Sequence, residues 1–153
     1  MCDSLVALGA ATADGSTLFA KNSDRPAAEA QVLERHEPRR ERSTACTHVA
    51  VDGLAGGETV GFVASRPTWC WGVEHGVNDA GVAAGNEAVF TTLDPRSAPP
   101  ALTGLDLVRL VLERSTTAAA GVEVLVGLLE RYGQGGACQE GAHASGSPRL
   151  SRP

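Results

Sequence analysis

Residue types near the start of the chain could carry out nucleophilic chemistry on an amide. Cys2 directly follows the initiator methionine, which is usually removed before a small side chain, so that cysteine would become the N-terminus. Its α-amine, with a reference pKa of about 8, could then accept the proton of the thiol of the same residue. The sequence therefore predicts Cys2 as a nucleophile that needs no histidine.

Three further polar residues have side chains suited to the rest of such a reaction. Asp24 could orient the amine of Cys2, and Lys21 could favour the thiolate through its charge. Asn86 could donate its side-chain amide to a developing oxyanion. From spacing alone a plainer interpretation stays open, in which residues 21–25 are a polar loop and Asn86 is a turn residue.

Other residues give weaker indications of a site. Glu74 and His75 lack a second histidine at helical spacing, so we expect no metal and no cofactor. Trp69 and Trp71 fit either a substrate cleft or the core, and the core is the favoured interpretation. Cys70 between them is expected to be a small buried residue.

Three pairs of strand-like segments should position these residues. Residues 4–8 and 16–20 flank Ala-Asp-Gly, residues 47–51 and 59–64 flank a glycine-rich link, and residues 71–75 and 81–89 flank a turn. The pattern predicts three consecutive hairpins in an antiparallel sheet. The basic stretch at residues 35–42 contains glutamates as well and is interpreted as a solvated loop.

Two helices are predicted after the hairpins. In the segment from Thr103 to residue 115, Thr103 and Asp106 resemble a capping box and apolar residues recur at helical spacing. A second segment at residues 117–131 has the same periodicity, and Gly133 follows it as a natural stop. The sequence therefore predicts an α+β fold with a helical layer on a sheet.

Composition restricts the class of protein further. With 153 residues the chain can form one domain, and its net charge of −5 argues against nucleic acid or an anionic membrane as a partner. No apolar run reaches the roughly 18 residues of a membrane helix. The four cysteines are scattered without a C-x-x-C spacing, which is typical of a reducing compartment, so we expect a cytoplasmic protein.

Several long motifs resemble one family. They are MCDSLVALGAATADGSTLFAKNSDRP, SRPTWCWGVEHGVNDAGVAAGNEAVF, TGLDLVRLVLERS and LLERYGQGG, which are similar to segments of the secernins. Secernins resemble dipeptidase-A-like cysteine peptidases among the N-terminal-nucleophile hydrolases. The resemblance implies an αββα sandwich, Cys2 as the nucleophile, and hydrolysis of a small peptide or amide, with dipeptides the leading substrate class.

The resemblance also implies roles for the other site residues. Relatives of the family include the penicillin V acylases and bile-salt hydrolases, whose motif of a basic residue, Asn, any residue and Asp corresponds to residues 21–24. Lys21 replaces the arginine of these acylases and keeps the charge, although a bidentate contact is lost. Asn86 falls near the asparagine that they use for the oxyanion.

The likeness ends at about residue 136, whereas members of the family continue through further strands. The resemblance thus implies that residues 1–136 are the N-terminal part of a hydrolase domain, and that residues 137–153 are a divergent tail. That tail is rich in small residues and is expected to be disordered. We expect a truncated, incomplete sandwich that lacks a complete site.

An incomplete sandwich has consequences for stability and function. Hydrophobic faces would lack part of their cover, so we expect poor stability or self-association through the exposed sheet, with the uncovered faces at Val49, Val51, Phe62 and Val82. The alternative function comes from the family's link to regulated exocytosis. In that interpretation the chain is a non-catalytic cytosolic protein that retains the hydrolase scaffold.

Overall fold

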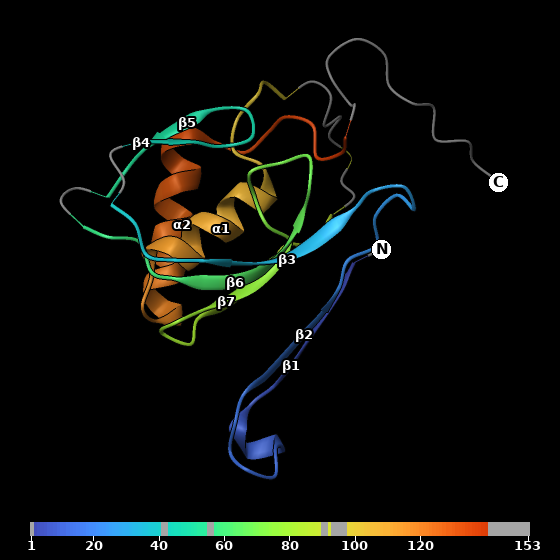
Figure 1. The fold of residues 1–153 in the computed structure, drawn as a ribbon, viewed down its shortest axis with the longest axis vertical. Coiled ribbons are helices and arrows are strands. Elements are labelled where there is room, and N and C mark those ends of the chain that lie inside the picture. Colours follow the sequence, from blue (N-terminus) through green and yellow to red (C-terminus); the bar gives the residue numbers. More distant parts are fainter. Residues whose placement is uncertain (1, 41–42, 55–56, 90–91, 93–97, 141–153) are drawn as a thin grey trace.

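In the computed structural model the chain combines antiparallel sheets with two helices (Figure 1). The structure describes residues 2–40, 43–54, 57–89, 92 and 98–140. Most of the tail expected to be disordered, residues 141–153, therefore lies outside the described residues. The elements are β1 (Asp3–Ala7), β2 (Leu18–Asn22), β3 (Gln31–His36), β4 (Ser43–Ala45), β5 (Ala50–Asp52), β6 (Phe62–Pro67), β7 (His75–Asn78), β8 (Ala83–Gly85), α1 (Gly104–Arg114) and α2 (Ala118–Tyr132).

Strands β1 and β2 form the first predicted hairpin, which projects away from the rest of the chain as an arm (Figure 1). Asp3 pairs with Asn22 at the base of the arm, and Ala7 pairs with Leu18 toward its tip. The connection is longer than the expected Asp-Gly turn, because it includes a short 3-10 helix at Gly9–Ala11. The hairpin is confirmed, and its base lies where Cys2 enters β1.

The second predicted hairpin is wrong. Strand β5 pairs with β4, and β6 pairs with β3 instead, in a four-stranded sheet of order β3-β6-β7-β8. Strand β3 includes Arg35 and His36, which were expected in a solvated loop. Both are held in the strand by side-chain partners, since Arg35 binds Asp79 and the His36 ring stacks on Phe62 at 4.5 Å. Residues 41–42 of that stretch lie outside the described residues.

The third predicted hairpin is confirmed with shorter strands. Strands β7 and β8 pair, and the Asn78 side chain closes their turn by accepting hydrogen bonds from the backbone N–H groups of Ala80 and Val82. Gly81 in this turn has φ +83°, a conformation that favours glycine. The Asn78 amide also donates to the backbone oxygens of Leu112 and Ser115, which fixes the turn to the end of α1.

Both helices begin and end close to the predicted residues. The Thr103 hydroxyl accepts from the Asp106 backbone N–H, and the Asp106 carboxylate accepts from the Thr103 N–H, so the expected capping box is present. Gly133, with φ +70°, follows α2 as its C-cap. Every residue of α1 from Gly104 to Glu113 is buried, because α1 lies between the four-stranded sheet and α2 (Figure 1).

The core corrects the expectation of uncovered faces. Val51, Phe62 and Val82 are buried, and Val49 packs against the core as a partly buried residue. Helix α1 covers Phe62 with Val108 and Leu112, so the sheet face near the helices is not open. Large apolar side chains are exposed elsewhere, on β3 and on the β1–β2 arm, at Leu5, Val6, Leu8, Leu18 and Leu33.

Across the described ranges, neither helix combines the length and apolarity needed to cross a membrane. The observed architecture confirms an α+β fold with antiparallel sheets and a helical layer. Membership of the N-terminal-nucleophile superfamily remains a prediction from the sequence.

Candidate active site at the base of the β1–β2 arm

Cys2 lies at the base of the β1–β2 arm, one residue before the first strand pair. Its side chain is partly exposed, and its Sγ is 4.0 Å from the backbone oxygen of Asp24. The chain leaving β2 therefore passes directly beside the thiol. Two of the residues predicted from the sequence, Cys2 and Asp24, are brought together here, and the Asp24 residue itself is exposed.

Lys21 lies on the same side of the arm as Cys2. It pairs with Ser4, and Ser4 is two residues from Cys2, so the alternation of side chains places all three on one face. Its Nζ donates to the Ser23 hydroxyl at 2.9 Å and to Oε2 of Glu74 at 3.1 Å. Both ends of the Lys21–Glu74 ion pair are buried, with side-chain exposures of 0% and 1%. Lys21 thus binds the arm to the body of the chain.

Asn86 follows β8 and is held by two elements. Its backbone N–H donates to the backbone oxygen of Glu74 at 2.9 Å. Its side chain lies against Gly104 at the start of α1, where a Cβ would overlap the Asn86 Oδ1. The main chain of Glu74 therefore holds Asn86, and the side chain of the same residue binds Lys21.

Glu74 is a functional candidate that the sequence indicates only as a partner of His75. Its Oε1 lies 3.5 Å from Nε of Arg25, so two cations share one buried carboxylate. Arg25 also donates to both oxygens of Glu29, at 2.7 and 2.8 Å, and these hydrogen bonds raise the pKa of Arg25. We call Lys21, Arg25, Glu29 and Glu74 the Glu74 cluster; its two positive and two negative charges balance.

One feature of the sequence could have indicated part of this cluster. Arg25 and Glu29 have the four-residue spacing of an ion pair, although the residues do not form a helix.

The two tryptophans lie in different surroundings. Trp69 contacts the Glu74 cluster, because its indole N–H donates to Oε2 of Glu29 at 2.9 Å. Trp71 is partly buried and packs against the core cluster around Leu107, as expected for a core aromatic.

His75 borders the arm on the sheet side. Its ring meets Phe19 of β2 edge to face, with centroids 6.5 Å apart. Burial lowers the pKa of His75, and the charge of Lys21 acts in the same direction. Within the described segments, no three histidine, cysteine or acidic side chains are grouped as metal ligands would be.

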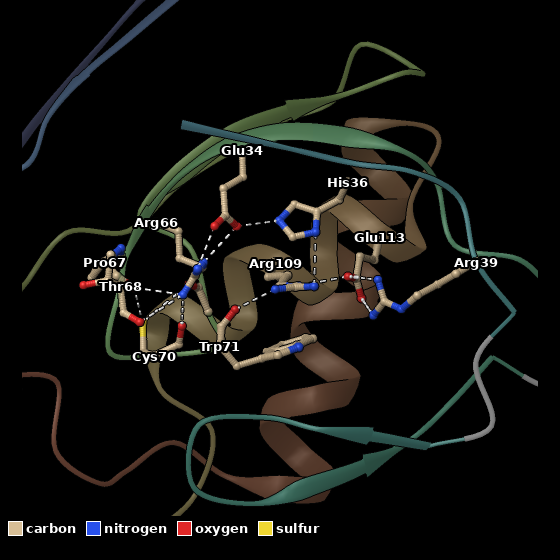
Figure 2. Close-up of polar contacts among 11 residues, drawn as sticks. Glu34, His36, Arg39, Arg66, Pro67, Thr68, Cys70, Trp71, Arg109 and Glu113 are labelled. Carbon is tan, nitrogen blue, oxygen red and sulfur yellow. Dashed lines mark hydrogen bonds and ion pairs between the residues drawn. The ribbon is translucent and has the colours of Figure 1, made fainter. Parts of the chain in front are cut away.

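A second charged network binds the edge strand β3 to helix α1 (Figure 2). On β3, Glu34 accepts from Arg66 at 2.6 and 2.9 Å and contacts Nε2 of His36 at 3.1 Å. The other ring nitrogen of His36 lies 3.4 Å from Arg109 of α1. Glu113 then accepts from Arg109 at 3.0 Å, which continues the chain of contacts along the helix.

The far end of this network holds Arg39 and the aromatic core. Arg39 donates to both oxygens of Glu113, at 2.8 and 3.2 Å, while the Arg109 guanidinium lies 4.2 Å from the ring centroid of Trp71 (Figure 2). Burial and the charge of Arg109 lower the pKa of His36. We assign this network to the stability of the fold, since it joins β3, the loop after it and α1.

Cys70 contacts the other end of the network and is no candidate nucleophile. Its backbone oxygen accepts from Arg66 at 2.8 Å, and its thiol is buried. Burial raises the pKa of the Cys70 thiol to about 12, so the thiolate is scarce at neutral pH. The expectation that Cys70 is a small buried residue is confirmed.

Fold and site together define an α+β protein whose second residue, Cys2, lies at the base of an arm that a buried lysine–glutamate pair binds to the body of the chain. The model of peptidase family C69 matches residues 1–144, and the chain belongs to this family of dipeptidase A and secernin-like cysteine peptidases. The match confirms the family that the sequence motifs indicated, and it supports a cysteine-peptidase type of function in general. No solved structure matches the chain.

Proposed function

We propose that the chain is an N-terminal-cysteine dipeptidase, or an amidohydrolase of similar small substrates, with Cys2 as its nucleophile. The observation that carries the proposal is the family match over residues 1–144. The position of Cys2 adds support, because its thiol lies against the backbone of Asp24 at the base of the arm. A cytoplasmic location remains a prediction. It is based on the scattered cysteines, and all four, which lie among the described residues, are free thiols.

The proposed reaction uses groups of Cys2 for both proton transfer and attack. After methionine removal, the α-amine takes the thiol proton and the sulfur attacks the carbonyl carbon of the amide. The Asn86 side chain donates to the oxyanion of the tetrahedral intermediate. The ammonium then gives its proton to the leaving amine, and water hydrolyses the remaining thioester to release the acid and restore the thiol.

The geometry refines the role proposed for Lys21. Because Glu74 binds its ammonium at 3.1 Å, the positive charge is offset by an equal negative charge close by. We therefore assign Lys21 to holding the arm rather than to strong activation of the thiol. Asp24 keeps its proposed role of orienting the amine. The resemblance to the acylases also implies catalytic Asn and Arg residues beyond the positions named here, so we expect an incomplete site with slow turnover at most.

The experiment that tests the proposal is intact-mass spectrometry before and after treatment with a thiol-directed electrophile, followed by a screen of dipeptides. We expect loss of methionine, fast single labelling at Cys2, and turnover that Cys2→Ser abolishes while Cys46→Ser does not. A retained methionine, or turnover that survives Cys2→Ser, would overturn the proposal. An effect in cells that tolerates Cys2→Ser would favour the non-catalytic alternative.

A further inference from the structure

We propose that Glu74 is a positioning residue for Cys2, whose buried carboxylate fixes the segment 21–25 and with it the base of the β1–β2 arm. The inference rests on the proposed function of Cys2. It concerns a residue that does not touch the reacting atoms and acts through Lys21, Arg25 and Asn86.

The contacts of Glu74 come from three separate parts of the chain. Its side chain binds Lys21 on β2 and Arg25 in the segment that follows, at 3.1 and 3.5 Å. Its backbone N–H donates to Ser65 of β6 at 2.8 Å, and its backbone oxygen accepts from Asn86 at 2.9 Å. One residue thus links the strand that carries Lys21, the four-stranded sheet, and the proposed oxyanion donor.

Burial makes the ion pair decisive for the position of Lys21. The side chain of Lys21 has no exposed surface, and that of Glu74 has 1%. A buried ammonium is stable only when it is paired, because its desolvation is otherwise not compensated. If Glu74 lost its charge, the buried ammonium of Lys21 would lose the carboxylate that compensates its desolvation, and its position would no longer be favourable. This loss loosens the connection between arm and body.

The arm depends on this connection because few of its side chains contact the body. Most of the arm projects into solvent, with Leu5 and Leu18 exposed (Figure 1). Contacts with the body gather on one face, where Phe19 meets His75 and both Phe19 and Lys21 lie over Gly85. The base of the arm, where Cys2 lies, is therefore held largely by Lys21 and the residues around it.

A matched control is provided by Glu113, a second buried glutamate bound by two cations. Its side chain has no exposed surface, and its partners are Arg39 and Arg109 in the network that binds β3 to α1. Loss of its charge also destabilises the fold, but it leaves the contacts of Lys21 and Asn86 in place. If Glu74 had a purely structural role, Glu74→Gln and Glu113→Gln would change the alkylation rate of Cys2 by the same factor.

The test compares Cys2 alkylation by iodoacetamide in the wild-type chain, Glu74→Gln, Glu74→Asp and Glu113→Gln. Rates are measured from pH 6 to 9, with the labelled site located by mass spectrometry and folding checked by circular dichroism. We expect the alkylation rate of Cys2 in Glu74→Gln to differ at least fivefold from that in wild type. The change should bring the rate closer to that of a free Cys-Asp dipeptide. Glu74→Asp should lie between, and Glu113→Gln should stay within twofold of wild type.

Three results would overturn the inference: overlapping profiles of Glu74→Gln and wild type, an equal change in Glu74→Gln and Glu113→Gln, or a wild-type profile equal to that of the dipeptide. If Glu74→Gln does not fold, the profile of Glu74→Asp decides in the same way. Turnover by the wild-type chain is measured separately. Absent turnover with Glu74-dependent alkylation would overturn the proposed function alone, whereas turnover with Glu74-independent alkylation would overturn this inference alone.

Discussion

Replacement of Glu113 by glutamine should be one of the most destabilising single changes in the chain. The substitution preserves the shape of the side chain and removes only its charge. Glu113 is fully buried, and it compensates the charges of Arg39 and Arg109, whose own side-chain exposures are 36% and 8%. In Glu113→Gln the buried Arg109 is left with contacts to Trp71 and His36 but with no bound carboxylate.

The size of the effect follows from this burial. Removal of one partner from a buried ion pair costs about 3–5 kcal/mol. Glutamine keeps one acceptor oxygen, so we expect the lower end, about 3 kcal/mol. With a urea m-value of about 2 kcal/mol/M, the unfolding midpoint should fall by about 1.5 M.

The assay is urea unfolding at pH 7.5, followed by circular dichroism. Glu58→Gln serves as the control, because Glu58 and its partner Arg40 are 60% and 86% exposed. Exposed pairs contribute about 0–1 kcal/mol, so the control midpoint should move by less than about 0.5 M. Equal midpoints for the two variants would refute the reasoning, since burial would then not determine how much an ion pair contributes to the free energy of unfolding.

Three further predictions address the site, the pH dependence and the cysteines. Gly104→Ala should lower kcat about 10²-fold, because the added Cβ would displace the Asn86 amide. Gly127→Ala, with open space at its Cβ, should keep kcat. An unaffected kcat in Gly104→Ala would remove Asn86 from the oxyanion site. Because the folded chain lowers the pKa of His36, the unfolded chain binds more protons below about pH 6.5, so stability should fall on acidification through that range. His36→Gln should flatten this fall in the urea midpoint between pH 7.5 and 5.5, and a midpoint that rises toward acid would contradict the assignment. Cys70, with its pKa of about 12, should resist alkylation at pH 7.5 until urea unfolds the chain, and early labelling in the native state would show that its burial is incomplete.

Local chemistry made the helices predictable. The capping box of Thr103 and Asp106 and the glycine after α2 act within a few residues, so their effect can be recognised without knowing the fold. The turn between β7 and β8 was recognised for the same reason. Residues close by in the sequence determine where these elements begin and end.

Strand pairing was predictable only where the strands are adjacent. The pairing of β3 with β6 joins residues about 30 positions apart, and the β4–β5 hairpin lies between them in sequence. The charges of residues 35–42 made the end of β3 look like part of a solvated loop. The charges of Glu34 and Arg35 are compatible with a strand because Arg66 and Asp79, remote in sequence, supply their partners.

The site shows the same division between local and remote information. Cys2, Lys21 and Asp24 could be proposed together because they lie in one short N-terminal segment. Glu74 was missed as the partner of Lys21, since 53 residues separate them and either charge alone is typical of a surface. A buried pair of this kind becomes recognisable only when the fold brings both residues together.

The direction of the β1–β2 arm has a practical consequence for protein engineering. An affinity tag fused before Cys2 would occupy the amine that the proposed reaction needs, and it would do so at the base of the arm. The tip, between β1 and β2, lies far from that base (Figure 1), and its residues around Asp14 and Gly15 are exposed. Exposed loop tips tolerate insertions. A short epitope or fluorophore site placed there would report on the chain while leaving its first residue native.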